Sequence, residues 1–176
     1  MKRIEIKEKV VRDVNHPTDL IVFLNDCEVQ YDLKAAQVIA LGSLTVGGSM
    51  NVTYNVTVVG GISIGSLDYL GRLEVGGELK IKHGNLIAVS VRAQDIEVGG
   101  SIFVLFFIRS LKDIIGRHGI VAGTRIEARN GSIIVNRWHS ICAGISTTGK
   151  KLNLNKIRAK EIKGNIVHGV ADIVSS

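Results

Sequence analysis

The chain has 176 residues, of which 45% are apolar and 22% charged, so the composition excludes a disordered chain and fits a single domain with one large core. The formal net charge of +6 permits an acidic partner without requiring one. The apolar residues are mainly β-branched, with 23 Ile and 21 Val beside 20 Gly and one Pro. Because β-branched residues favour extended backbone and Gly allows tight turns, this composition predicts an all-β protein.

Residues 1–32 are the first segment, and they contain no Gly. The segment begins with alternating charged and apolar residues and lacks the unbroken apolar stretch of a secretory signal. The two cysteines, Cys27 and Cys142, are too few for a disulfide framework, so we expect a reducing, cytoplasmic location. We predict that residues 1–32 cap one end of the domain and that residues 33–176 form its repetitive body.

Four Gly-Gly doublets, at residues 47–48, 60–61, 76–77 and 99–100, each separate two short stretches of alternating apolar residues. Looser copies follow around Gly131 and Gly164. One such unit cannot bury its inward Ile and Val side chains, whereas stacked units share one continuous core. The repeat therefore predicts a single-stranded parallel β-helix. The alternative is a β-sandwich or barrel, but hairpin signals are scarce, with Asn130-Gly131 the only Asn-Gly or Asp-Gly pair.

A second phrase recurs at residues 91–96, 126–131 and 157–162. If these phrases lie on successive turns, their second residues form an outward ladder of alternating charge, and their third residues point inward where the interior is narrow. The outward set is Arg92, Glu127 and Arg158, and the inward set is Ala93, Ala128 and Ala159.

Two of the glycine segments, Gly42-Ser-Leu-Thr-Val-Gly-Gly-Ser-Met and Ala93-Gln-Asp-Ile-Glu-Val-Gly-Gly-Ser-Ile, resemble the coils of bactofilins and related polymer-forming bacterial β-helix proteins. The resemblance covers roughly residues 33–170. It implies a cytoplasmic scaffold of stacked coils that assembles end to end without a nucleotide. The irregular coil lengths and the long N-terminal segment depart from that pattern.

The repeat is interrupted at residues 102–119, which begin with the longest apolar run of the chain. Seven apolar residues are far fewer than the ~20 that a membrane-spanning helix needs. Ser110, with Asp113 three residues later, resembles a capping box. We therefore predict a short helical or loop excursion from the coil near residues 105–119.

The aromatic residues of this run cannot all be buried in one strand, because alternation sends Phe103, Leu105 and Phe107 to one side and Val104 and Phe106 to the other. One side needs a cover, either the excursion folded back over it or another subunit. The residues predicted to mediate self-association are Phe103, Leu105, Phe106 and Phe107.

Charge is distributed unevenly, with a net charge of −2 over residues 1–108 and +9 over residues 109–163. A basic stripe in the second half would neutralise phosphates, although Trp138 is the only aromatic residue there for base stacking. The alternative is an ordinary solvated face. The candidate polyanion-binding residues are Arg109, Lys112, Arg117, Arg125, Arg129, Arg137, Lys156, Arg158 and Lys160.

No catalytic, metal-binding or cofactor-binding motif is apparent. The five histidines are scattered, and His139 and Cys142 have no second pair of ligands nearby. None of the glycine doublets is followed by the Lys-Ser/Thr of a phosphate-binding loop, and the carboxylates are not grouped as in polysaccharide-cleaving β-helices. The doublet spacings do not follow the six-residue period of acyltransferase coils. We therefore predict a protein that is not an enzyme, with no small-molecule substrate.

The expected function is a structural or interaction module that self-associates through the β-helix ends or the apolar run, giving a homo-oligomer. The net charges of the two halves would also favour head-to-tail contacts. The alternative is a basic module that binds nucleic acid or a nucleoprotein complex, as an accessory protein of a phage or another mobile element would.

Overall fold

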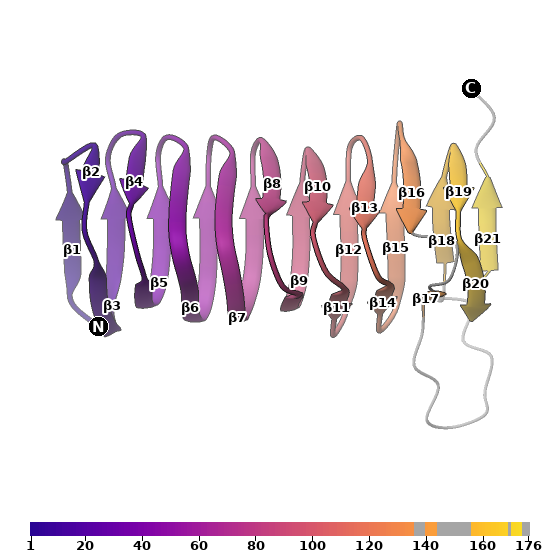
Figure 1. The fold of residues 1–176 in the computed structure, drawn as a ribbon, viewed down its shortest axis with the longest axis horizontal. Helices are drawn as coiled ribbons and strands as arrows, with labels where there is room; N and C mark the ends of the chain where they lie inside the picture. Colours follow the sequence, from indigo (N-terminus) through magenta and orange to yellow (C-terminus); the bar gives the residue numbers. More distant parts are fainter. Residues whose placement is uncertain (136–139, 144–155, 169, 174–176) are drawn as a thin grey trace.

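Successive turns of this chain lie on top of one another in a computed structural model that describes residues 1–135, 140–143, 156–168 and 170–173. Every strand pairing in these residues is parallel. The partner of a residue is 17 or 18 positions away over most of the chain, as Arg3 lies beside Leu20 and Val38 beside Val56. The predicted parallel β-helix is confirmed (Figure 1), and the alternative of two antiparallel sheets is excluded.

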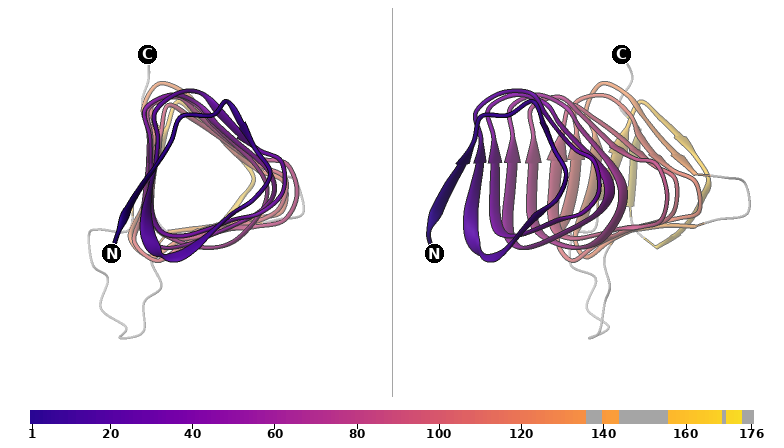
Figure 2. Two further views of the ribbon diagram at one scale, coloured as in Figure 1. Left: turned by 90° about the vertical axis from the view of Figure 1, so that its left-hand side faces the viewer. Right: turned by 60° about the vertical axis from the view of Figure 1, so that its left-hand side comes forward.

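Viewed along its axis, the coil has a triangular outline (Figure 2), because each turn contributes strands to three flat faces. The first face consists of β1 (Arg3–Ile6), β12 (Phe107–Ser110), β15 (Arg125–Ala128), β18 (Lys156–Ala159), β21 (Val170–Ile173) and the C-terminal parts of β3 (Val14–Phe23), β5 (Leu33–Ala40), β6 (Leu44–Val58), β7 (Ile62–Val75) and β9 (Leu86–Ala93).

The second face consists of β2 (Val10–Val11), β4 (Cys27–Val29), β8 (Glu78–Ile81), β10 (Asp95–Val98), β13 (Ile114–Gly116), β16 (Ser132–Val135), β19 (Glu161–Lys163) and the N-terminal parts of β6 and β7. The third face contains β11 (Ile102–Val104), β14 (Ile120–Ala122), β17 (Ser140–Ala143), β20 (Asn165–His168), the N-terminal parts of β3, β5 and β9, and the middle parts of β6 and β7.

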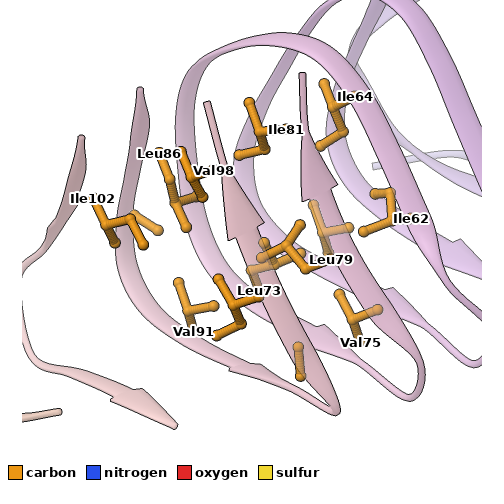
Figure 3. Packing of buried hydrophobic residues seen from close by; sticks show 14 of the residues in the cluster. Ile62, Ile64, Leu73, Val75, Leu79, Ile81, Leu86, Val91, Val98 and Ile102 are labelled. Carbon is orange, nitrogen blue, oxygen red and sulfur yellow. The ribbon is translucent and has the colours of Figure 1, made fainter. Parts of the chain in front are cut away.

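The core consists of columns of stacked side chains. Each column forms because the parallel register places an inward side chain directly beside the inward side chain of the next turn. Leu79 illustrates this arrangement, since it lies between Ile62 and Ile96 on the second face and is fully buried. Leu73 and Val91 are neighbours in the same way on the first face. The labelled side chains of Figure 3 converge from several turns on one interior, so the apolar residues form a single core.

The glycine doublets lie where the chain turns from one face to the next, and close backbone approach explains their residue type. A side chain at Gly47 would collide with the carbonyl oxygen of Gln30 in the preceding turn. At Gly76 it would collide with the carbonyl oxygen of Val59. Because neither glycine has a positive φ, the stacking of corners rather than an unusual backbone conformation excludes larger residues here.

Short polar side chains hold successive corners together. In each case an Asp or Asn side-chain oxygen accepts a hydrogen bond from the backbone N–H of a Ser in the next turn, at 2.7 or 2.8 Å. The pairs are Asp26 with Ser43, Asp32 with Ser49, Asn85 with Ser101 and Asp113 with Ser132. These bonds satisfy N–H groups at corners, where the regular ladder of backbone bonds is interrupted.

The predicted excursion near residues 105–119 is wrong, because β12 and β13 continue the regular coil there. Ser110 does not cap a helix. Its hydroxyl instead donates a 2.9 Å hydrogen bond to the backbone oxygen of Gln94 and accepts a 3.2 Å bond from the N–H of Lys112. The described residues contain no helix that could cross a membrane.

The N-terminal residues 1–32 are themselves coiled, as β1, β2, β3 and β4 pair in parallel with the following turns. They continue the three faces rather than forming a separate fold. Their role as a cap stays a prediction.

Asp95 lies at the corner between the first and second faces, and its pKa is raised from the usual value of 3.8. Burial is the main cause, and the charges of Asp113 and Glu78 act in the same direction, whereas a hydrogen bond from the Ile96 N–H and the charge of Lys112 oppose it. A carboxyl whose pKa is raised by folding favours the folded state when protonated, so its ionised form destabilises the fold as pH rises.

We therefore expect Asp95→Asn, which keeps the oxygen that accepts the Ile96 bond, to be more stable than the parent protein at pH 7. The difference should vanish at pH 3, because Asp95 is then protonated in both states. Urea unfolding at the two pH values measures this difference. An equal effect of the substitution at pH 3 and pH 7 would contradict the expected dependence.

Candidate functional site

Charged side chains form a ladder along the outside of the first face. Its order is Glu74, Arg92, Arg109, Glu127 and Arg158, each beside the next across parallel strands. The predicted ladder of Arg92, Glu127 and Arg158 on successive turns was therefore incomplete, because Arg109 lies between the first two. Its inward counterpart is confirmed in part: Ala93, Ala128 and Ala159 are buried, and Ser110 occupies the same column.

Glu127 is the centre of an ion cluster in this ladder. Strand alternation places Arg125, Glu127 and Arg129 on the same side of the chain, and the parallel register brings Arg109 alongside. The Glu127 carboxylate accepts from Arg109 Nε at 2.9 Å and from Arg129 Nε at 3.4 Å, and it lies 3.9 Å from Arg125 Nη1.

Only 6% of the Glu127 side chain is exposed, compared with 27% of Arg109 and 54% of Arg129. A buried carboxylate needs such partners, because an unpaired charge in this position would lose its hydration without compensation. The three arginines exceed the single carboxylate in charge, so the cluster remains positive.

Most of the predicted polyanion-binding residues gather around this cluster. Arg109, Arg125 and Arg158 lie on the first face, and Lys156 occupies a backbone position beside Arg125 in the next turn. The residues at or just after the end of this face are Lys112, Arg129 and Lys160.

Two predicted residues do not join this group. Arg117 follows β13 and lies at the corner between the second and third faces. Arg137 lies outside the described residues. The prediction also omitted Arg92, although the recurring phrase that contains it was the available signal.

The apolar run near residue 103 forms an exposed patch. Phe103 is 43% exposed on the third face, between Ile87 and Val121 of the neighbouring turns. Leu105 and Phe106 follow at the corner and are 61% and 51% exposed. We define the apolar patch as Ile87, Phe103, Leu105 and Phe106.

Simple alternation placed these side chains incorrectly. Because the chain bends at Leu105 and Phe106, Phe106 points outward with its neighbour instead of inward with Val104. Phe107 is only half-exposed, lies beside Arg125 on the first face, and has its ring centroid 5.8 Å from the Arg109 guanidinium carbon. It therefore belongs with the arginines rather than with the apolar patch. Residues 107–116, which follow directly, continue the coil and do not fold over the patch.

At the N-terminal end of the coil, three inward apolar side chains are less completely covered than those in the middle of the coil. Ile4 and Ile6 continue the inward columns of the first face beside Ile21 and Phe23, yet both are only half-buried. Val11 on the second face is likewise half-buried against the core. Within the described residues β1 pairs on one side only, with β3, so the hydrogen-bonding groups of its other edge face away from the sheet.

The described residues offer little for catalysis. No three of the His, Cys, Asp and Glu side chains among them lie close enough together to hold a metal ion. Burial raises the pKa of the Cys27 thiol, and the charges of Glu8 and Glu28 raise it further. This thiol is therefore protonated at neutral pH and is not an activated nucleophile.

Comparisons with models of protein families, with curated proteins and with solved structures found no match to this chain. The chain shares a parallel β-helix with the bactofilins that its sequence resembles, and the comparisons give no support for that family in particular.

Proposed function

We propose that this chain is a non-enzymatic structural module that self-associates through the ends of its β-helix. The observation that carries the proposal is the N-terminal end, where a strand edge without a partner among the described residues and half-buried core residues occur together. A second copy that added its own end strand would bond to the free backbone groups of β1 and would cover Ile4 and Ile6. Edge pairing and apolar burial would then act at one surface.

The side chains that alternate with these isoleucines favour such a contact. Arg3 and Glu5 form an ion pair with each other, with 2.8 Å between Arg3 Nη2 and Glu5 Oε1. The charges of β1 are thus matched within the strand, and they repel a second copy less than a row of like charges would. The apolar patch around Phe103 supports a separate, lateral contact between coils.

The test is sedimentation velocity of the full chain over a wide range of concentration. We expect the average mass to rise above the 19.0 kDa of one chain as the concentration increases. Ile4→Lys should weaken this association at least about tenfold, since a charge would be buried at the joined ends. Val59→Lys is the matched control, because Val59 is 61% exposed at a corner in the middle of the coil.

A parent protein that stays at the mass of one chain at every concentration would overturn the proposal. If Ile4→Lys and Val59→Lys associate alike but Phe106→Lys does not, copies join through the apolar patch and not through their ends.

A further inference from the structure

A hollow opens at the end of the first face, where strands β7, β9 and β12 lead into the next corner. It has a volume of about 360 Å³ and crosses several turns of the coil. The lining residues are Val75, Gly76, Arg92, Ala93, Gln94, Arg109, Ser110, Leu111 and Arg129. We call this the arginine hollow.

The arginines of the hollow are held in a way that leaves hydrogen-bond donors available. Arg109 and Arg129 each use Nε to bind the Glu127 carboxylate. Within the described part of the chain, no hydrogen bond or ion pair engages their terminal Nη groups, and Arg92 has no ion-pair partner. A guanidinium fixed through Nε still presents two Nη groups, which suit the oxygens of a tetrahedral anion.

Glu127 therefore acts as an anchor below the hollow rather than as a competitor inside it. Its carboxylate is almost completely buried and is not among the lining residues. Three arginines line the hollow, and no acidic residue does. An anion bound there would be neutralised by three arginines, two of which, Arg109 and Arg129, are already held in place by Glu127, and this lowers the entropic cost of binding.

We propose that the arginine hollow binds the phosphate dianion, either free or as the terminal group of a small phosphate ester. The arrangement favours a compact anion over a polymer, because the buried Glu127 interrupts the column of arginines between Arg109 and Arg158. Gln94 and Leu111 border the hollow on the corner side, where a polar and an apolar contact are available to the rest of an ester. This site is independent of the proposed self-association.

The experiment is isothermal titration of the full chain with inorganic phosphate at constant ionic strength. We expect saturable binding below about 20 mM phosphate. Arg92→Gln should weaken it at least about tenfold, since a charge-assisted contact is lost while the Glu127 cluster stays intact. Arg109→Lys should also weaken it, because Lys keeps the charge but not the planar fork. Arg12→Gln is the matched control, an exposed arginine beside Tyr31 near the N-terminal end.

Two further titrations distinguish the sources of phosphate. A small phosphate ester that binds at least as tightly as inorganic phosphate, with the same sensitivity to Arg92→Gln, supports the proposal. Absence of saturable phosphate binding, or an equal loss in Arg12→Gln, would overturn it. Tight binding of single-stranded DNA that Arg117→Gln weakens as much as Arg92→Gln would also overturn it, in favour of a diffuse polyanion surface. None of these results bears on the sedimentation experiment.

Discussion

Leu79→Ala is expected to lower the free energy of unfolding by about 2–5 kcal/mol. Leu79 is fully buried between Ile62 and Ile96 of the adjacent turns, so truncation removes apolar contacts on both sides. The neighbouring turns cannot close the resulting cavity without disturbing the hydrogen bonds that fix their spacing. Because a domain of this size is stabilised by only about 5–15 kcal/mol, the loss should be plain in urea unfolding.

The adjacent residue supplies the control for this substitution. Lys80 points outward from the same strand, and its Nζ lies 2.7 Å from Glu97 Oε2 in the next turn. Both side chains are more than two-fifths exposed, so water screens this ion pair and Lys80→Ala should leave the stability almost unchanged. If both substitutions lowered the stability by similar amounts, Leu79 would not face the core while Lys80 faces the solvent, and the inward and outward positions of this strand would be wrong.

Gly47→Ala is expected to destabilise the fold by about 3 kcal/mol, which is large for the addition of one methyl group. The new Cβ would collide with the carbonyl oxygen of Gln30, a backbone atom that cannot move aside as a flexible side chain can. The corner of one turn would have to separate from the corner below it. Thermal unfolding followed by circular dichroism measures the effect.

A glycine in a neighbouring doublet provides the comparison. A Cβ at Gly61 would lie 3.3 Å from the nearest backbone atom, the carbonyl oxygen of Glu78, so a small adjustment accommodates it. Gly61→Ala also reduces the conformational freedom of the unfolded chain, which favours the folded state. We expect its stability to stay within about 1 kcal/mol of the parent. Equal destabilisation by both substitutions would contradict the account, because the close approach to the neighbouring turn differs between the two positions.

The fold could be predicted from the sequence because the pattern that produces it is repeated along the chain. Each glycine doublet marks a corner, and each flanking stretch alternates inward and outward, so the parallel β-helix follows from the need to bury many short apolar stripes together. The length of a turn was harder to obtain. The doublets at 60–61 and 76–77 lie between the first and second faces, whereas those at 47–48 and 99–100 lie between the second and third, so the spacing from one doublet to the next does not give the period of 17 or 18 residues.

The errors in the sequence analysis have local causes. Ser110 and Asp113 have the spacing of a helix cap, but in the coil the Ser110 hydroxyl bonds to Gln94 and the Asp113 carboxylate bonds to the N–H of Ser132. These partners belong to neighbouring turns and are invisible to a local pattern. Alternation put Phe106 on the same side as Val104 for a similar reason, since alternation holds only within a strand and fails at a bend.

The candidate site could be predicted only in part. The concentration of positive charge after residue 108 is a property of the sequence, but which charges meet depends on the register. Arg109 lies beside both Arg92 and Glu127 because turns of 17 and 18 residues bring them together. The hollow beside them is lined by residues of several turns. Such a site is created by stacking and has no continuous motif.

The parallel stacking of turns is tested most directly by nuclear Overhauser contacts in a uniformly labelled sample. Backbone contacts should connect residues 17 or 18 positions apart, such as Thr45 with Ser63 and Glu97 with Lys80. Along each pair of strands, the residue numbers of both partners should rise together. Close Hα–Hα contacts between strands, with one partner rising in number as the other falls, would instead identify antiparallel hairpins and would contradict the β-helix.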